Sequence, residues 1–296
     1  MASPRVISTI SELRAAVREL QRTGKTVGLV PTMGALHEGH LSLVRRAKSE
    51  CDVAVATIFV NPTQFAPHED FSKYPRTLEA DLQLLATANC DLVFVPSRDE
   101  MYPPDASTYI APPQVAQPLE GVCRPGHFQG VATVVLKLFN IIPADRAYFG
   151  QKDFQQALVI QRMAADLNLP VQVVVCPIIR EPDGLAMSSR NRYLSPRERQ
   201  QVLAVSRALT SLQEAVGRGE RDATELKLQM QNTLRAAGIE RVDYATIADP
   251  MTLSDLARLD GPAVALIAAY VGTTRLIDNC LLTAPTGSPQ DDPAQG

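Results

Sequence analysis

The sequence lacks several features that would assign it to particular protein classes. Its five cysteines are scattered and form no Cys-x-x-Cys pair, so neither a disulfide framework nor a cysteine zinc site is predicted. No block of lysine and arginine occurs and the formal net charge is -3, which argues against nucleic acid as a partner. No apolar run approaches a membrane-spanning length, and the first residues show no signal-peptide pattern. We therefore expect a cytoplasmic globular protein that does not associate with membranes.

What the sequence does contain is a regular alternation of apolar runs with amphipathic segments. Strands are predicted at 27–30, 53–60, 92–95, 146–149 and 171–175, and helices at 11–24, 39–50, 78–89, 131–142 and 154–166. The segment 131–142 is ambiguous, because its β-branched residues favour a strand while its length and Gly130 favour a buried helix; we choose the helix. Alternating strands and helices predict an α/β fold, with an open parallel sheet covered by helices on both faces.

The pattern changes after Pro177. Ser195 to Glu198 reads as a capping box with proline at the first helical position, and Asp222 opens a second helix that stops at Gly238. Strands are predicted at 242–247, 263–270 and 274–278. The sequence thus predicts a first domain over 1–177, a smaller α+β domain over 178–283 and a disordered tail over 284–296.

The most informative stretch runs from Val27 to Leu41. An apolar strand ends at Pro31, a glycine-rich turn follows, and a helix begins near His40. Free backbone N–H groups and the positive end of a helix dipole meet at such a junction, so it is suited to binding phosphate.

The chemistry of His37 and His40 is open from spacing alone. Metalloprotease histidines are four residues apart on a helix, whereas these are three apart and no third ligand is evident, which argues against zinc. Gly34 and Gly39 have P-loop spacing, but His40-Leu41 replaces the required Lys-Ser/Thr, and no G-x-G-x-x-G occurs. The two histidines either contact phosphate or simply cap the turn.

A resemblance separates these alternatives. The stretch resembles the H-x-G-H signature of the nucleotidyltransferase superfamily, which includes class I aminoacyl-tRNA synthetases. Four more segments match the pantothenate synthetase (pantoate–β-alanine ligase) family, and the similarity spans about residues 5–282. They are Phe59-Val-Asn-Pro-Thr-Gln-Phe65, Arg124-Pro-Gly-His-Phe128, Gly150-Gln-Lys-Asp-Phe-Gln-Gln156 and Met187-Ser-Ser-Arg-Asn191.

The resemblance implies a Rossmann-like domain that binds ATP and pantoate, and a C-terminal lid that closes about a hinge near Pro177–Arg180. It also implies a reaction in two steps. (R)-pantoate is first adenylated by ATP with Mg²⁺, releasing pyrophosphate, and β-alanine then attacks pantoyl adenylate to give pantothenate and AMP. The family is typically a homodimer. The lid would bring Met187–Arg190 over the phosphates and exclude water.

The resemblance also implies roles for individual residues. The catalytic groups are His37, His40, Lys152 and Arg190. The ATP-binding residues are Met33, Gly34, Ala35, Leu36, His37, Glu38, Gly39, His40, Gly150, Gln151, Lys152, Asp153, Ile179, Met187, Ser188, Ser189 and Arg190. Gln64 binds pantoate and β-alanine, Gln156 binds pantoate, and Asp81 is a candidate metal ligand. Met33 and the apolar face of 131–142 would accommodate the gem-dimethyl group of pantoate.

Two other functions are compatible with parts of this pattern. One is an adenylyltransferase that stops at nucleotide transfer to a phosphorylated acceptor, and the other is a nucleotide-binding regulatory protein without turnover. The tRNA synthetase alternative is weaker, because Met187-Ser-Ser-Arg190 replaces the two-lysine loop of those enzymes and no anticodon-binding extension is evident.

Overall fold

The chain folds into two units of different architecture, the first ending at Leu194 and the second starting at Ser195. The computed structural model describes residues 3–67 and 69–283, so the tail predicted to be disordered, 284–296, lies outside the described residues. Within the described ranges, no helix has both the length and the apolar composition needed to cross a membrane.

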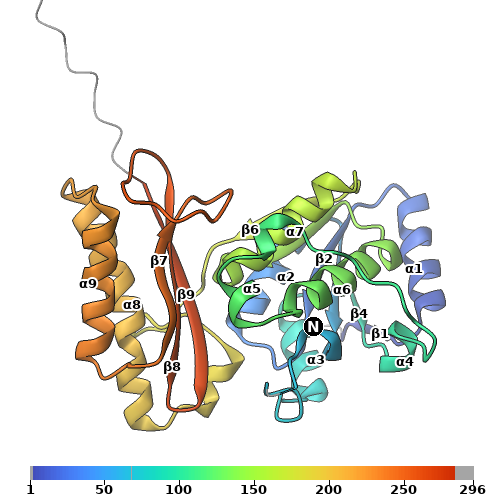
Figure 1. The fold of residues 1–296 in the computed structure, drawn as a ribbon. Coiled ribbons are helices and arrows are strands. Elements are labelled where there is room, and N and C mark those ends of the chain that lie inside the picture. The colour runs from blue at the N-terminus through green and yellow to red at the C-terminus, as the bar shows by residue number, and fades with distance from the viewer. Residues whose placement is uncertain (1–2, 68, 284–296) are drawn as a thin grey trace, which may run out of the picture. The chain divides into compact units, whose positions relative to one another are not determined.

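The first unit is built on six parallel strands (Figure 1). They are β1 (Arg5–Ile7), β2 (Val27–Thr32), β3 (Val53–Ile58), β4 (Leu92–Phe94), β5 (Arg146–Gly150) and β6 (Gln172–Cys176). Their order is β1-β4-β3-β2-β5-β6, and every pairing is parallel, which confirms the predicted open sheet. The chain moves outward from β2 through β3 to β4 and then returns to place β5 on the other side of β2. The strand order therefore reverses between β2 and β5, where ligands bind in open α/β sheets.

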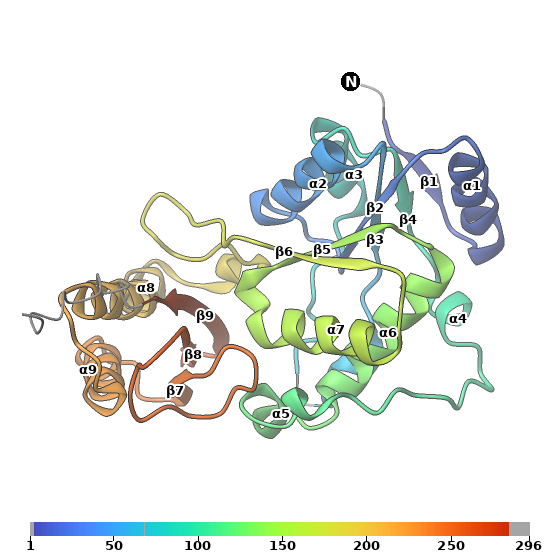
Figure 2. The ribbon, with the colours of Figure 1, turned by 90° about the horizontal axis from the view of Figure 1, so that it is seen from above.

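Helices cover both faces of this sheet. The longer ones are α1 (Ile10–Arg22), α2 (Glu38–Glu50), α3 (Leu78–Thr87), α6 (His127–Ile141) and α7 (Phe154–Asp166). Val27 and Leu29 pack into a core shared with α1, α6 and α7, whereas Val30 packs into a second core with α2 and α3. Figure 2 shows α2 and α3 on one side of the strands and α6 and α7 on the other. Because both faces of the sheet centre are covered, the central strands β2 and β3 are largely apolar and buried.

The short elements escaped the sequence prediction. β1 has three residues, and the one-turn helices are α4 (Arg98–Met101) and α5 (Glu120–Cys123). The 3-10 turns are η1 (Pro62–Gln64), η2 (Gln114–Ala116), η3 (Gln151–Asp153) and η4 (Ser189–Tyr193). Single turns and the partly exposed edge strand β1 show no hydrophobic pattern, whereas the short strands β4, β5 and β6 were predicted from their apolar runs.

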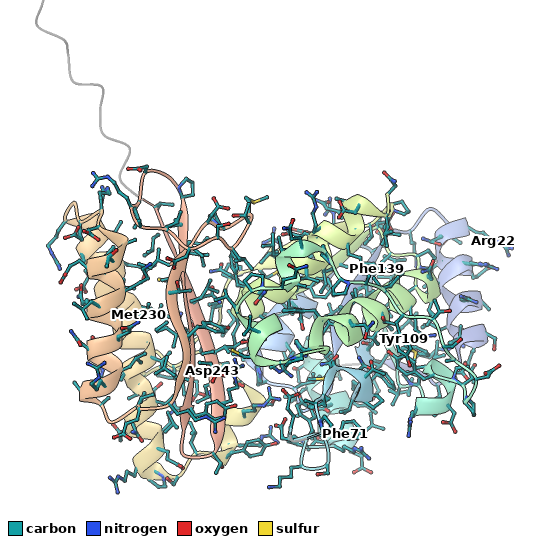
Figure 3. All side chains as sticks on the ribbon, in the orientation of Figure 1. Arg22, Phe71, Tyr109, Phe139, Met230 and Asp243 are labelled. Carbon is teal, nitrogen blue, oxygen red and sulfur yellow. The ribbon has the colours of Figure 1, made fainter. Side chains whose placement is uncertain are left out.

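The ambiguous segment 131–142 is helical, as predicted. It forms most of α6, which carries eleven buried residues, so its β-branched side chains are fully used in packing. Phe139, labelled in Figure 3, is one of these buried residues.

The second unit consists of two helices and three antiparallel strands. They are α8 (Pro196–Gly217), α9 (Ala223–Ala236), β7 (Val242–Ala248), β8 (Ala263–Val271) and β9 (Thr274–Leu282), and the strand order is β7-β8-β9. Ser195 and Glu198 form the predicted capping box of α8, and Asp222 caps α9. Met230 on α9, labelled in Figure 3, is fully buried. The predicted α+β architecture is confirmed.

The boundary between the units differs from the predicted one at 177/178. Residues 178–194, which include Met187–Arg190, belong to the first unit. Long-range contacts hold them there: Arg190 donates two hydrogen bonds to Asp70, and the hydroxyl of Tyr193 donates to the carbonyl of Lys73. A composition change after Pro177 could not reveal these pairings, because they join segments more than a hundred residues apart.

Gly130 lets α6 approach the η1 turn closely. A Cβ atom at this position would lie 2.4 Å from the carbonyl oxygen of Thr63 and 2.7 Å from the nitrogen of Gln64. We predict that Gly130→Ala lowers the free energy of unfolding by about 1–3 kcal/mol, because overpacking against rigid backbone outweighs the helical preference of alanine. Thermal and denaturant unfolding measure the change.

Gly217→Ala is the matched control for this substitution. Gly217 is also helical, but it is exposed and no atom lies within 4 Å of an added Cβ. This variant should be unchanged or slightly more stable. Equal effects of the two substitutions would contradict the close approach at Gly130.

Candidate active site

A cavity opens at the carboxyl ends of β2, β3 and β5, at the point where the strand order reverses. Every residue that lines it belongs to the first unit. The sequence-predicted residues among them are Met33, His37, Gly39, His40, Gln64, Gly150, Lys152, Asp153, Gln156, Ile179, Met187, Ser188, Ser189 and Arg190. Segments far apart in the sequence thus meet in one cavity, and they carry many of the residues to which the resemblance assigns ATP and pantoate binding.

The loop from β2 to α2 is held by a buried carboxylate. Gly34 and Ala35 both have positive φ, at 80° and 51°. In this turn the backbone N–H groups of Ala35 and Leu36 point inward. Asp81, only 1% exposed, accepts from the N–H of Ala35 at 3.0 Å and of Leu36 at 2.8 Å. The hydroxyl of Thr77 donates to the same carboxylate.

This environment changes the assignment of Asp81. The sequence suggested a metal ligand, but both carboxylate oxygens accept hydrogen bonds from the protein, and the residue does not line the cavity. Asp81 is therefore a structural anchor that sets the path of the loop toward His37.

His37 and His40 form the first turn of α2 and have defined tautomers. The backbone N–H of Gly39 donates to Nδ1 of His37 at 3.2 Å, and the N–H of His37 donates to Nδ1 of His40 at 3.4 Å. A nitrogen that accepts from a backbone N–H carries no proton, so each neutral ring is protonated on Nε2. Gly39 is required here, because a Cβ atom would lie 2.9 Å from the His37 ring. The turn therefore presents two Nε2–H donors from rings that line the cavity.

Burial keeps both rings neutral. Desolvation, with the positive charge of Lys152 as a further cause, lowers the pKa of His37 from 6.5 to about 4. Desolvation, followed by His37 and Lys152, lowers the pKa of His40 to about 3. Near pH 7 the pair thus donates hydrogen bonds without carrying full charge.

A chain of amides orients Gln64. The N–H and hydroxyl of Thr63 donate to Oδ1 of Asn61, which leaves Nδ2 of Asn61 to donate to the carbonyl of Gly130 at 3.2 Å. The same Nδ2 donates to Oε1 of Gln64 at 3.1 Å. Since Oε1 is engaged, the NH₂ group of Gln64 faces Met33 and the cavity. Gln64 therefore offers N–H donors to a ligand.

Two adjacent glutamines at the start of α7 have different roles. Gln155 is buried and holds the segment before α5, donating to the carbonyls of Val115 and Pro118 and accepting from the N–H of Glu120. Gln156 lines the cavity, as do Lys152 and Asp153 in the preceding turn. The resemblance selected the glutamine that faces the cavity.

The segment 187–190 contributes hydroxyls and a guanidinium. Ser189 lies 3.3 Å from the hydroxyl of Tyr74, and Arg190 donates to both oxygens of Asp70 at 3.0 and 2.9 Å. Tyr74 and these residues of the segment line the cavity. Arg190 is thus positioned by a carboxylate in a fork-to-fork geometry.

One wall of the cavity is apolar. Val131, Val134, Val135 and Leu138 are spaced along one face of α6 and line the cavity, as does Met33. Met33 and this helix thus supply an apolar wall in the cavity, and the resemblance implies that such a wall accommodates the gem-dimethyl group of pantoate.

Five of the predicted ATP-binding residues do not line the cavity; they are Gly34, Ala35, Leu36, Glu38 and Gln151. The first three shape the loop, and Glu38 forms an exposed ion pair with Arg45. Lining residues that were not assigned beforehand include Thr32, Thr57, Phe59 and Asn61. Their position at or just after strand ends was the available signal.

The cavity does not offer a protein cage for a metal ion. Among the described residues, no group of three or more His, Cys, Asp or Glu is arranged to hold one. Asp153 is the one carboxylate among the described lining residues. This donor set fits a Mg²⁺ ion that enters with a triphosphate, since Mg²⁺ is commonly held by phosphates, water and one or two carboxylates.

Comparisons with known proteins agree on one family. A family model for pantoate-beta-alanine ligase matches residues 5–281. The chain is 57% identical over 280 residues to pantothenate synthetase from Roseiflexus sp. (strain RS-1), covering 95% of this chain and all of the relative. It is 53% identical over 278 residues to pantothenate synthetase from Thermotoga neapolitana, covering 94% and 99%.

Solved structures give the same result. Pantothenate synthetase from Thermus thermophilus superposes with a TM-score of 0.89 at 47% identity, covering 93% of this chain and 98% of that chain. Pantoate-beta-alanine ligase from Francisella tularensis, complexed with beta-gamma ATP and beta-alanine, gives a TM-score of 0.79 at 35% identity and covers 96% and 99%.

The neutral histidines predict a pH-dependent stability. In the unfolded chain their pKa returns to 6.5, so as the pH falls from about 6.5 toward 4 the unfolded state binds protons that the folded state does not. We predict that the free energy of unfolding falls as the pH is lowered from 6.5 to 5, where ordinary carboxylates remain ionised. Above pH 6.5 this contribution is constant. Denaturant unfolding at several pH values measures it.

A double substitution isolates the two rings. His37→Asn with His40→Asn removes both titrating groups, and asparagine at position 37 is itself a good N-cap. The decrease in stability between pH 6.5 and 5 should be smaller in this variant. An identical decrease in both proteins would contradict the depressed pKa values.

Proposed function

Because the chain belongs to the pantoate–β-alanine ligase family, we propose that the cavity of the first unit performs its reaction through an enzyme-bound pantoyl adenylate. The protein is an enzyme that catalyses the ATP-dependent ligation of pantoate and β-alanine. One observation supports the proposed site above all. The two Nε2–H donors of the H-x-G-H turn share a cavity with Lys152 and Arg190, and also with the Gln64 amide and an apolar wall.

In the proposed first step, a carboxylate oxygen of pantoate attacks the α-phosphorus of ATP. A new O–P bond forms, the bond between the α-phosphorus and the bridging oxygen breaks, and pyrophosphate leaves with that oxygen. Negative charge grows on the bridging oxygen and on the α-phosphate. His37 and His40 are suited to stabilise it, because neutral N–H donors held by backbone bonds need no reorganisation during the reaction.

The cationic side chains in the cavity can reduce the repulsion between the two anionic substrates. A carboxylate and a triphosphate repel each other, so phosphate charge must be neutralised without suppressing the nucleophile. Lys152 and Arg190 line the cavity and can contact phosphate oxygens. Gln64 and Gln156 are neutral, and they can orient the pantoate carboxylate or hydroxyl while leaving the carboxylate reactive.

In the proposed second step, the amine of β-alanine attacks the acyl carbon of the adenylate. A C–N bond forms, the C–O bond to AMP breaks, and the amine loses a proton. The orientation of the Gln64 NH₂ group toward the cavity supports a contact with this substrate as well. Water must be kept away, because an acyl adenylate is readily hydrolysed.

We extend the proposal to the setting of the reaction. Mg²⁺ would enter with ATP and shield phosphate charge, with Asp153 as the carboxylate nearest to that role. From the family resemblance we further propose a homodimer that works in the cytoplasm, and a lid movement of the C-terminal unit during turnover.

Exchange of labelled pyrophosphate into ATP tests the adenylate. We predict that exchange requires pantoate and that AMP is released only after β-alanine is added. His40→Ala should reduce exchange by at least about a hundredfold, the scale of losing a donor to developing charge. The variant should still fold, since the side chain of His37 still accepts the N–H of Gly39 at the start of α2. A modest decrease in the thermal midpoint is expected, because the N–H of His37 loses its bond to His40. Exchange without pantoate would instead indicate a simple adenylyltransferase, and absence of any AMP release would indicate a binding protein.

Gln64→Ala tests the pantoate side of the cavity. We predict a loss of about tenfold or more in kcat/KM for pantoate with the KM for ATP nearly unchanged, because one hydrogen bond to a charged group contributes about 1.5–3 kcal/mol. Steady-state kinetics with each substrate varied in turn measure this. Gln129→Ala is the control, since Gln129 is exposed on α6. A selective loss of ATP affinity in Gln64→Ala would move this residue to the nucleotide side.

A further inference from the structure

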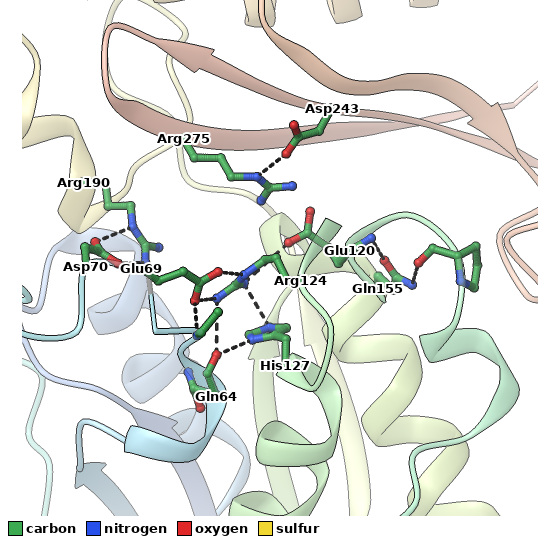
Figure 4. Close-up of polar contacts among 12 residues, drawn as sticks. Gln64, Glu69, Asp70, Glu120, Arg124, His127, Gln155, Arg190, Asp243 and Arg275 are labelled. Carbon is green, nitrogen blue, oxygen red and sulfur yellow. Dashed lines mark hydrogen bonds and ion pairs between the residues drawn. The ribbon is translucent and has the colours of Figure 1, made fainter. Parts of the chain in front are cut away.

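The backbone of Gln64 is held from behind the cavity by a cluster that the proposed chemistry does not use. Nδ1 of His127, at the start of α6, lies 2.9 Å from the carbonyl oxygen of Gln64. Nε2 of the same ring lies 3.1 Å from Nη1 of Arg124. Figure 4 shows His127 between the guanidinium of Arg124 and the Gln64 backbone. Neither Arg124 nor His127 lines the cavity.

These two contacts define the state of the His127 ring. A carbonyl oxygen only accepts, so Nδ1 carries the proton and donates to Gln64. A guanidinium only donates, so Nε2 is unprotonated and accepts from Arg124. A doubly protonated ring would turn an N–H toward the Arg124 cation and lose this bond. Burial, followed by the charge of Arg124, lowers the pKa of His127 to about 4, in agreement with a neutral ring.

Arg124 is itself immobilised by carboxylates. Its Nε and Nη2 atoms donate to the two oxygens of Glu69 at 2.6 and 2.9 Å, and Glu120 lies 3.5 Å away. Glu69 also accepts from the N–H of Ala66, on the loop that carries Gln64. The side chains of Arg124 and Glu69 are only 16% and 15% exposed, so the pair is well shielded from solvent. The contacts thus form a closed ring between the loop after β3 and the start of α6.

The cycle of contacts among His127, Arg124 and Glu69 holds Gln64, whose side chain has little freedom. The amide of Gln64 is oriented by Asn61, which is bonded to the carbonyl of Gly130 on α6. Asn61 sets the orientation of the amide relative to α6. The distance of the amide from a ligand in the cavity then depends on the position of the Gln64 backbone. The bond from His127 is the shortest hydrogen bond that the structure gives to the Gln64 carbonyl, and the second, from Arg124 at 3.5 Å, is at the limit of such contacts.

We infer that His127, Arg124 and Glu69 form a positioning unit that fixes the backbone of Gln64 so that its amide meets pantoate at the correct distance. The inference rests on the proposed role of Gln64 as a pantoate ligand. His127 is a positioning residue in this scheme, because it acts through Gln64 and touches no substrate.

Substitutions at His127 distinguish positioning from simple packing. His127→Phe keeps a planar ring but removes the donor, and His127→Asn retains an N–H donor at a similar reach. We expect His127→Phe to lower kcat/KM for pantoate about tenfold while the KM for ATP changes less than about twofold, the loss expected when a buried carbonyl loses its partner. His127→Asn should recover most of the loss. Pantoate-dependent pyrophosphate exchange and steady-state kinetics provide both values.

One control and one replacement variant accompany these substitutions. Phe139→Leu destabilises α6 at a buried site away from the cavity, so it should lower the thermal midpoint without a selective effect on pantoate. If His127→Phe does not fold, Glu69→Gln replaces it, because this near-isosteric change removes the charge that holds Arg124. Glu69→Gln should show the same selective loss for pantoate, of a few fold.

A double substitution separates this inference from the proposed function. If His127 acts through Gln64, adding His127→Phe to Gln64→Ala should reduce kcat/KM for pantoate little further. Full additivity, equal effects on ATP and pantoate, or wild-type pantoate kinetics in folded His127→Phe would overturn the positioning unit while leaving the role of Gln64 intact. Wild-type pantoate kinetics in Gln64→Ala would overturn both.

Discussion

The site depends first on one buried carboxylate. The turn from β2 to α2 passes through two consecutive residues of positive φ, Gly34 and Ala35, a conformation that costs about 1 kcal/mol or more for alanine. Asp81 offsets this cost by accepting the two backbone N–H groups that the turn directs into the interior. Its position in the first turn of α3 adds the favourable end of a helix dipole. Without the hydrogen bonds to Asp81, the loop would lack the contacts that place His37 at the start of α2.

In the H-x-G-H turn, capping is compatible with the proposed contact with phosphate, two roles that the sequence presented as alternatives. His37 does cap α2, since its Nδ1 accepts a backbone N–H, and the same bond places the ring proton on Nε2. Because the cap uses Nδ1 of His37, it leaves the Nε2–H of the same ring as a hydrogen-bond donor. Lys152 helps to keep the rings neutral and lines the same cavity, so the full positive charge stays on lysine and arginine and the histidines supply directional donors.

The sequence predicted the features that arise from local periodicity. The strands at 53–60 and 146–149, the helix at 131–142 and the capping box at Ser195 all follow from apolar spacing and cap chemistry, and all are present. The resemblance supplied the cavity residues, since spacing alone could not choose Gln156 over Gln155. Features created by long-range contacts were missed. The Asp70–Arg190 pair keeps 178–194 in the first unit, and the backbone bonds to Asp81 make it an anchor rather than a metal ligand.

In the proposed reaction, the arrangement of neutral and charged groups would let one cavity hold two anions while one of them attacks the other. An arginine fork facing the carboxylate would stabilise it in the ground state and lower its reactivity, so uniform binding would give no rate advantage. An amide avoids this problem only if its N–H end faces the ligand. In Gln64 that end is selected by a chain of bonds from Thr63 through Asn61, each with one possible direction. The specificity of the proposed pantoate site thus derives from hydrogen-bond polarity, which a rigid backbone must maintain, and the contacts of His127 and Gly130 with the η1 turn supply that rigidity.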